Sequence, residues 1–231
     1  MYDLEFNGRT ASMLGIKIAY RPDMPVPQRS IESIKIPGRD GSLIISDSTY
    51  NDITIDVEMN FISRPTDWGY RFSQIKKWLK GSGRLKFPFE NGNFYKCKNV
   101  SIDTVYRTVK EAGEFTASFL CEPYAYFESG TIPIEQTTPT ILNPYSLSKP
   151  IYIVTGTGEC KLWVNGNIMT ANVEGNLTID TDLMIAYKED GTIQNTKVTG
   201  DYEGLYLKEG ENDLTINNPF SLQIIPNWRT L

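Results

Sequence analysis

The amino-acid sequence predicts a mainly β protein with one α-helix. Three observations lead to this fold class: apolar and polar residues alternate with a period of two in many segments, one segment has helical apolar spacing, and Asn-Gly pairs separate several of the alternating runs. Antiparallel strands covered on one side produce this alternation, because successive side chains point to opposite faces of a sheet.

The strongest strand signal spans residues 53–61, where five apolar side chains alternate with Thr54, Asp56, Glu58 and Asn60. Weaker runs of the same kind cover residues 14–20, 85–89, 100–102 and 115–121. Asn91-Gly92 lies between two such runs and predicts a β-hairpin, since both residues tolerate positive φ.

One segment, residues 66–83, predicts a helix instead. Its apolar residues recur at spacings of three and four, and we expect them to anchor the helix on a sheet. Thr66 or Asp67 is the expected cap at its start, and Gly81 or Gly83 ends it. The candidate core anchors are Trp68, Phe72, Ile75, Trp78 and Leu79.

Proline content and charge predict two domains. Residues 131–149 contain several prolines, which suit an extended linker. Residues 1–149 carry 18 basic and 17 acidic side chains, whereas residues 150–231 carry 5 and 11. We therefore expect an N-terminal domain at 1–130, a linker at 131–149 and an acidic second domain at 150–231.

The sequence of the second domain predicts a small antiparallel β-sandwich. About seven short apolar strands recur between residues 151 and 225, with no helical spacing among them. Asn165-Gly166 predicts a hairpin turn between two of these strands.

The absence of histidine excludes many enzyme classes. Among 231 residues there is none, so neither a Ser-His-Asp triad nor a Cys-His pair can form. The commonest transition-metal ligand is also missing. Cys97, Cys121 and Cys160 form no CxxC motif, and we expect them to be buried, reduced thiols. No catalytic, metal-binding or cofactor-binding residue is assigned.

Charge and hydropathy exclude two kinds of partner. Neither half has a basic stripe, which disfavours sequence-specific nucleic-acid binding. No apolar run approaches about 18 residues and the N-terminus lacks a secretion signal, so we expect a soluble protein made in a cytoplasm, with no membrane partner.

The segment IPGRDGSL, residues 36–43, is a candidate functional loop. Gly38 and Gly41 bracket Arg39 and Asp40 between two strand-like segments. A plain hairpin turn and a functional loop fit this pattern equally well.

The order of several segments resembles the distal tail (Dit) proteins of long-tailed, non-contractile phages. In the first half these segments are PGRDGSL, ITIDVEMNF, IKKWLKGSGRLKF, FENGNFYKCK and FTASFLCEPYAYF. In the second half they are KPIYIVTGTGECKLWVNGN, NLTIDTDLMIAY, LKEGENDLTI and PNWRTL. The resemblance covers nearly the whole chain, although the family's Phe-Pro before a late sandwich strand is replaced by Glu203-Gly204.

The resemblance implies a structural virion protein rather than an enzyme. It implies a homo-hexameric ring at the distal end of the tail, which links the tail tube to the baseplate or tip and leaves a central channel for DNA. The implied N-terminal domain is tail-tube-like, and the second is a galectin-like β-sandwich, with the last residues packing back on the first.

The resemblance also implies partners and a location. The expected partners are the tail tube protein, the tail-associated tip protein, the tape-measure protein and a receptor-binding protein. The expected location is the virion tail tip, after assembly in the cytoplasm of a bacterial host. Gly38, Arg39, Asp40 and Gly41 are the candidate ring-interface loop.

The residues also leave two alternative functions open. Trp163 and the acidic sandwich allow a carbohydrate-binding module that attaches to the host cell wall, although galectin-type recognition uses a histidine that this chain lacks. Paired carboxylates allow a glycosidase, whose required spatial separation no sequence pattern reveals.

Overall fold

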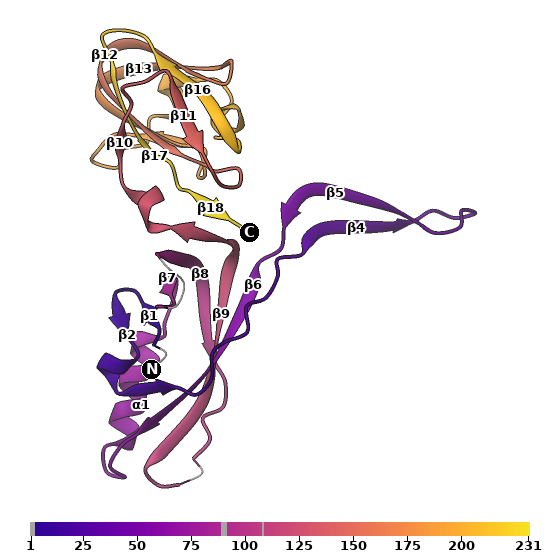
Figure 1. Ribbon diagram of the computed structural model, residues 1–231, viewed down its shortest axis with the longest axis vertical. Coiled ribbons are helices and arrows are strands. Elements are labelled where there is room, and N and C mark those ends of the chain that lie inside the picture. Colours follow the sequence, from indigo (N-terminus) through magenta and orange to yellow (C-terminus); the bar gives the residue numbers. More distant parts are fainter. Residues whose placement is uncertain (1–2, 89–91, 108) are drawn as a thin grey trace. The chain divides into compact units, whose positions relative to one another are not determined.

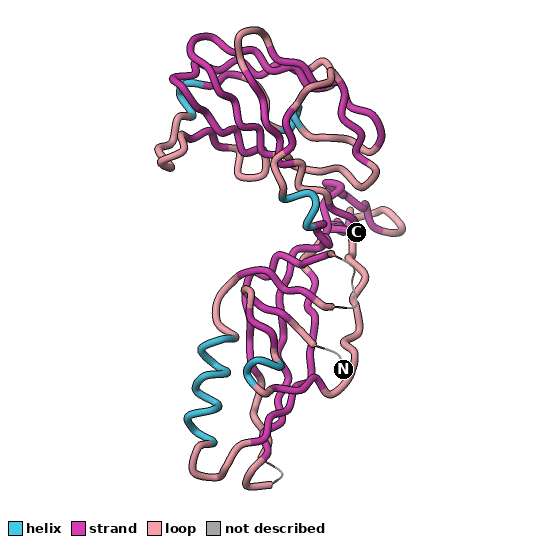
Figure 2. Tube along the Cα trace, turned by 60° about the vertical axis from the view of Figure 1, so that its left-hand side comes forward, coloured by secondary structure: helices cyan, strands magenta, loops and turns pink. Residues whose placement is uncertain are grey.

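The computed structural model describes residues 3–88, 92–107 and 109–231, and it divides into two compact units. The first unit comprises residues 1–125 with Leu231, and the second comprises Tyr126–Thr230. Strands dominate both units and α1 (Trp68–Trp78) is the α-helix of the described residues, so the predicted fold class is confirmed (Figures 1 and 2).

The first unit is built on one antiparallel sheet. Its strands follow the order β2 (Arg9–Thr10), β1 (Glu5–Phe6), β7 (Gly83–Lys86), β8 (Asn93–Ile102), β9 (Ala112–Phe127), β6 (Ile53–Ile62) and β3 (Ile16–Ile18). A short 3₁₀ turn, Ser12–Leu14, lies between β2 and β3. The predicted hairpin after β7 forms, since β7 pairs antiparallel with β8, but Asn91 of its turn lies outside the described residues.

Strand β6 shows why this sheet forms. Its buried and exposed residues alternate along the strand as predicted, and its apolar face packs into the core of the unit. It pairs with β9 over its whole length, from Ile53 opposite Cys121 to Ile62 opposite Ala112. The sheet therefore has one apolar face and one polar face along these two strands.

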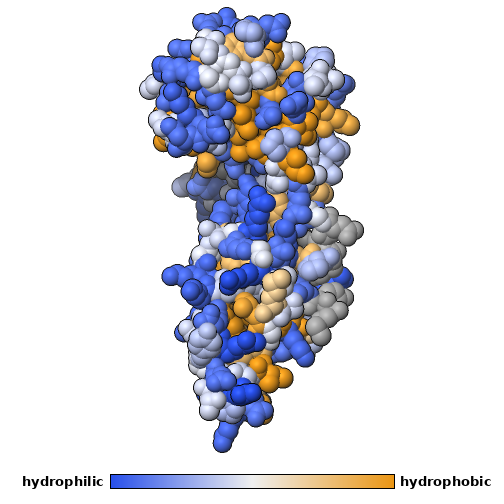
Figure 3. Space-filling view, turned by 90° about the vertical axis from the view of Figure 1, so that its left-hand side faces the viewer, coloured by the Kyte–Doolittle hydropathy of each residue, from blue (hydrophilic) through white to orange (hydrophobic). Residues whose placement is uncertain are grey.

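Helix α1 covers the apolar side of the sheet (Figure 2). Asp67 precedes it without a side-chain capping bond, and the Trp78 indole Nε1 donates a buried hydrogen bond of 3.1 Å to the Phe6 carbonyl. Of the five expected anchors, Ile75, Trp78 and Leu79 are buried, while Trp68 and Phe72 are partly buried against the same core. Figure 3 shows the helix side of this unit, where small apolar patches are interspersed with polar residues.

The second unit contains its own antiparallel sheet network and a separate apolar core. Its central strands follow the order β10 (Ile134–Glu135), β17 (Ser221–Ile225), β12 (Ile151–Val164), β13 (Asn167–Asp180) and β14 (Ile185–Tyr187). Strand β16 (Gly210–Ile216) pairs with β12 and with β11 (Thr140–Asn143), and β15 (Val198–Thr199) pairs with β13. Strand β18 (Arg229–Thr230) pairs with β9, whose last two residues belong to this unit. Short 3₁₀ turns cover Glu128–Thr131, Asn195–Lys197 and Glu203–Leu205.

Strands β12 and β13 form one long hairpin where the sequence suggests several short strands. All 14 residues of β12 pair with β13, and the turn is the predicted Asn165-Gly166, with φ of 49° and 84°. Gly156 lies directly opposite Gly175, and both have positive φ. Glycine adopts this backbone conformation without a steric penalty from a Cβ atom. The pairing therefore continues through glycine-containing stretches that the sequence suggests as ends of strands.

The segment at 131–149 differs from the predicted linker, because it contributes two strands to the second unit. Strand β10 pairs with β17, and β11 pairs with β16. Pro133 and Pro139 directly precede these strands and Pro144 follows the second. Prolines at strand ends need not donate to the ladder, so they flank the strands instead of preventing them.

Candidate functional site

The segment around IPGRDGSL forms a two-stranded arm outside the main sheet. Strand β4 (Arg29–Lys35) pairs antiparallel with β5 (Ser42–Tyr50), and Figure 1 shows this pair as a hairpin that leaves the sheet. We call residues 29–50 the arm. Across it, Ile31 lies opposite Ser46, Glu32 opposite Ile45, Ser33 opposite Ile44 and Ile34 opposite Leu43.

The tip of the arm is the predicted turn. Gly38 and Gly41 have φ of 82° and 77°, a region that favours glycine, and the Arg39 amide donates a 3.2 Å hydrogen bond to the Ile36 carbonyl. Arg39 and Asp40 between the glycines are exposed. The turn therefore presents both charged side chains to the surroundings.

The base of the arm is held by contacts with the rest of the unit. The Tyr50 ring meets the Tyr124 ring of β9 edge to face, with centroids 6.2 Å apart, and the Arg29 guanidinium lies 5.9 Å from the Tyr50 centroid. The Asn51 amide donates to the Gln28 carbonyl at 2.9 Å. The contact between Tyr50 and Tyr124 joins the arm to the sheet, and the other two contacts close the base of the arm.

Both faces of the arm carry exposed apolar side chains. Residues directly opposite each other in an antiparallel pair share a face. One face carries Ile31 and Ile44, which are 59% and 61% exposed, and the other carries Ile34, Leu43 and Ile45, which are 38–47% exposed. Exposed apolar patches of this kind mark interaction sites, and a patch on each side calls for cover on each side.

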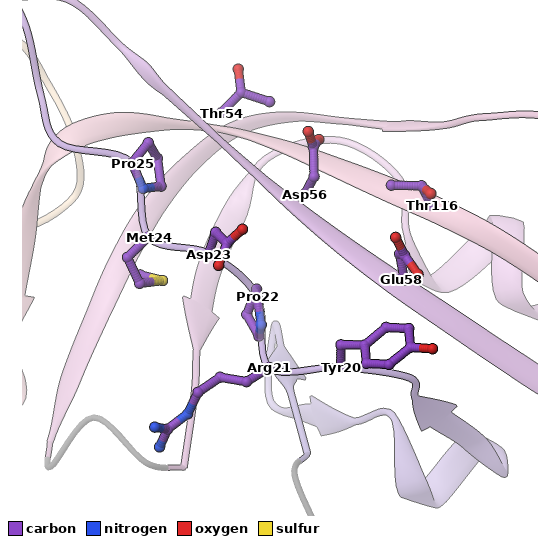
Figure 4. A pocket seen from close by; sticks show the side chains of 10 residues that line it. All are labelled: Tyr20, Arg21, Pro22, Asp23, Met24, Pro25, Thr54, Asp56, Glu58 and Thr116. Carbon is purple, nitrogen blue, oxygen red and sulfur yellow. The ribbon is translucent and has the colours of Figure 1, made fainter.

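A hollow of about 640 Å³ lies on the polar face of the main sheet (Figure 4). Asp56 and Glu58 of β6 and Thr116 of β9 form its floor, and the segment from Tyr20 to Pro25 forms its rim. A second hollow of about 330 Å³ shares Tyr20, Glu58 and Thr116 with the first and adds Glu114.

These hollows are acidic. Asp23, Asp56, Glu58 and Glu114 line them, and Arg21 is the basic side chain among the lining residues. With carboxylates, hydroxyls and no thiol or imidazole, the lining suits polar recognition better than nucleophilic chemistry.

A third hollow, of about 500 Å³, lies within the second unit between β10 and β11. Its wall includes Tyr145, whose ring stacks on Phe127 with centroids 4.0 Å apart and lies 6.4 Å from Trp228. The exposed apolar residues Ile134 and Leu142 line its mouth.

The structure does not bring the two sets of sequence-predicted residues together. Gly38–Gly41 are exposed at the tip of the arm, whereas the helix anchors pack into the core. The apolar side chains of the arm and the acidic hollows were not predicted from the sequence. Period-two patterns on both sides of PGRDG, in RSIESIK and GSLIIS, are the signal that could have revealed the arm.

Other candidate chemistry is limited within the described ranges. No group of three or more Cys, Asp or Glu residues there could hold a metal ion. No described helix has both the length and the apolar character needed to cross a membrane. The three cysteines are buried and unbonded, as expected.

Comparison with known proteins gives a likeness of fold. No family model and no curated protein matches this chain. Among solved structures, the Dit protein of phage SPP1 superposes with a TM-score of 0.74 over 97% of this chain and 98% of its own, at 14% sequence identity. That structure is described as a paradigm of the hub adsorption apparatus in phages that infect Gram-positive hosts.

The likeness agrees with the family resemblance inferred from the order of the sequence segments. At 14% identity few side chains are shared, so what the two proteins have in common is the course of the backbone through both units. This chain has the fold of a phage distal tail protein.

Proposed function

We propose that this protein is a structural component of a phage virion, in which six copies form a ring-shaped hub at the distal end of the tail. In this proposal the ring links the tail tube to the baseplate or tip and leaves a central channel for DNA. The observation that carries the proposal is the likeness to the SPP1 hub protein over nearly the full length of both chains.

The arm supports assembly into a ring. A closed ring is built from head-to-tail contacts, in which each subunit offers two different surfaces. The arm is one such surface, because its exposed isoleucines on both faces lack cover within the described chain. Gly38, Arg39, Asp40 and Gly41 at its tip would then lie against the neighbouring copy.

The near-balanced charge of the first half supports the same arrangement. Residues 1–149 carry 18 basic and 17 acidic side chains, so six copies can approach without strong mutual repulsion. The proposed partners along the axis of the ring are the tail tube protein, the tape-measure protein and the tail-associated tip protein. The second unit is the proposed attachment point for a receptor-binding protein.

The proposal assigns no catalytic role and no cofactor to the chain, and places it in the virion at the tail tip after assembly in the host cytoplasm. The alternative, a carbohydrate-binding module, has less support. Trp163 of β12 is partly buried between Ile168 and Thr215 on the neighbouring strands, a position typical of sheet packing.

Light scattering on the purified full-length chain, coupled to gel filtration, tests the proposal. We expect a species of six times the 26.2 kDa chain mass, and rings with a central hole in negative-stain micrographs. A monomer at every concentration, with no ring in micrographs, would contradict it. Pull-down of the same protein on host cell walls tests the alternative, and binding by the monomer would favour it.

A further inference from the structure

Strand β11 of the second unit has an open edge. It pairs with β16 on one side, and no strand of the described chain pairs with it on the other. Where this pairing begins, the Leu214 amide donates a 2.7 Å hydrogen bond to the Pro139 carbonyl. Because bonded and non-bonded positions alternate along antiparallel strands, the main-chain amides and carbonyls of Thr140 and Leu142 point away from β16. The Thr140 carbonyl accepts a 2.9 Å hydrogen bond from the Thr138 hydroxyl.

Strand β14, at another edge of the same unit, is closed by its own chain. The Ala186 amide donates a 2.7 Å hydrogen bond to the Asn195 side-chain oxygen, and the Gln194 amide donates one of 2.6 Å to the Ala186 carbonyl. The amide and carbonyl of Leu142 have no such partner among the described residues. Uncovered main-chain groups on an edge strand are a template for pairing with another chain.

A hollow lies beside the open edge of β11. It is the one of about 500 Å³ between β10 and β11, with Tyr145 in its wall. Leu142 and Ile134 at its mouth are 65% and 41% exposed. Successive side chains of an extended strand point to opposite faces, so a strand added to β11 would direct every second side chain toward this hollow. Its mouth suits an apolar side chain.

Three carboxylates surround the open edge. Glu211 and Asp213 of β16 lie opposite Leu142 and Thr140, and both are exposed, as is Glu135 of β10. None of the three carboxylates forms an ion pair within the described part of the chain. A second copy of the same edge would bring like charges together, whereas Lys or Arg side chains would be attracted. The charge therefore favours a basic partner over self-pairing.

We propose that β11 binds an extended polypeptide segment of another protein, which adds as a strand along the open edge. The segment places an apolar side chain in the hollow and Lys or Arg side chains beside Glu211 and Asp213. In this mode of recognition, main-chain hydrogen bonds give affinity and side-chain pockets give specificity. The inference goes beyond the proposed function and stands without it, because every residue that carries it belongs to the second unit.

A displayed library of random peptides of about twelve residues, selected on the immobilised full-length protein, tests the inference; this length covers the four residues of β11 with both flanks. We expect the enriched peptides to share an apolar residue close to Lys or Arg. Their affinity should fall as salt rises from about 0.05 M to about 0.5 M, because the attracted charges are exposed. No enrichment over the bare matrix, or enrichment of acidic peptides, would overturn the inference.

Variants at the open edge locate the binding of an enriched peptide. Leu142→Pro removes the outward amide without removing a bond to β16, and should weaken binding at least about tenfold. Leu142→Ala keeps the amide and should weaken binding less. Glu211→Gln combined with Asp213→Asn should reduce both the affinity and its salt dependence. Ile193→Ala, beside the closed edge of β14, is the control and should bind as wild type does.

Hydrogen exchange followed by NMR gives a result that needs no variant. With the enriched peptide bound to the wild-type chain, the Leu142 amide should become protected, while the Ala186 amide of the closed edge should not change. This measurement decides if Leu142→Pro fails to fold. Protection confined to another segment, or equal peptide affinity of wild type and a folded Leu142→Pro variant, would overturn the inference.

Discussion

At the scale of single residues, one amphipathic aromatic side chain contributes to the stability of the first unit. Trp78 fills the space between α1 and the sheet, and its indole nitrogen has a hydrogen-bond partner in the Phe6 carbonyl. A tryptophan in this position contributes both buried apolar area and a satisfied donor.

Replacing Trp78 by alanine should lower the free energy of unfolding by about 3–5 kcal/mol, because it leaves a cavity and an unpaired carbonyl. Urea unfolding followed by circular dichroism measures the change. Tyr70→Ala is the matched control on the same helix, since Tyr70 is 72% exposed, and its effect should stay within about 0.5 kcal/mol. Equal effects of the two substitutions would show that α1 does not cover the core.

In the second unit, Tyr152 gives a pH-dependent prediction. Its phenol is fully buried and donates a 2.7 Å hydrogen bond to the Leu205 carbonyl, and burial raises the pKa of this tyrosine far above its usual range. The phenol is therefore neutral in the folded state at pH values where the unfolded chain, with a tyrosine pKa of about 10, has already ionised.

When the pKa of an acid is higher in the folded protein than in the unfolded chain, the acid contributes its full stabilisation at pH values below the unfolded pKa. This stabilisation is lost as the pH rises above the unfolded pKa. Above pH 10, wild type should lose stability by about 1.4 kcal/mol per pH unit more steeply than Tyr152→Phe. Below pH 9 the Phe variant should be less stable by about 1–3 kcal/mol, because the Leu205 carbonyl loses its donor. Parallel stability curves above pH 10 would show that the phenol ionises in the folded protein.

At the scale of elements, the arm is the feature that a single chain does not explain. A two-stranded ribbon is marginally stable by itself in water, and this one exposes isoleucines on both faces. If a neighbouring copy covers the arm, substitutions on either face should weaken assembly. The same substitutions should leave the fold of the monomer unchanged.

Ile44→Lys on one face and Leu43→Lys on the other should each reduce the ring fraction in light scattering by at least about tenfold, since a buried unpaired charge costs well over 1.4 kcal/mol. The melting temperature of the monomer should shift by less than about 2 °C, because the arm lies outside both cores. Ile193→Lys, at a residue 64% exposed in the second unit, is the control and should leave assembly unchanged. An effect from one face alone would show that the arm is covered on one side.

Elements were predicted well where one periodicity dominated the local sequence. They were predicted poorly where the structure depends on how separate segments pair in space. The alternation in β6 and the helical spacing around Ile75 are local signals, and both elements form. The strands within 131–149 were missed because prolines dominate that segment, although they lie at strand ends. The hollow beside Asp56 could not be predicted, since its rim lies about 30 residues from one part of its floor and about 90 residues from the other.

At the scale of the whole molecule, the two cores share no residue. Each core has its own tryptophan, with Trp78 in the first and Trp228 in the second. The structure therefore allows the stability of the two units to be perturbed separately.

Because the two cores are separate, the two units should unfold in separate thermal transitions. Trp78→Ala should lower the midpoint temperature of one calorimetric transition of the full chain, and Phe220→Ala should lower that of the other. Each substitution should reduce the free energy of unfolding of its own unit by about 3–5 kcal/mol, which is typical of a large-to-small core substitution. Phe220 packs on Gly156 in the second core, which makes it the counterpart of Trp78. A single transition that moves equally with both variants would show that the units unfold as one.

The long β12–β13 hairpin has a consequence for the time course of folding. Its 14 pairs begin at a two-residue turn, so closing it needs no long loop. The central pair of the first unit, β6 with β9, joins residues 50 to 68 positions apart. Because non-local pairings form more slowly, the β12–β13 hairpin is expected to form before the β6–β9 pair, although the ribosome makes its strands later.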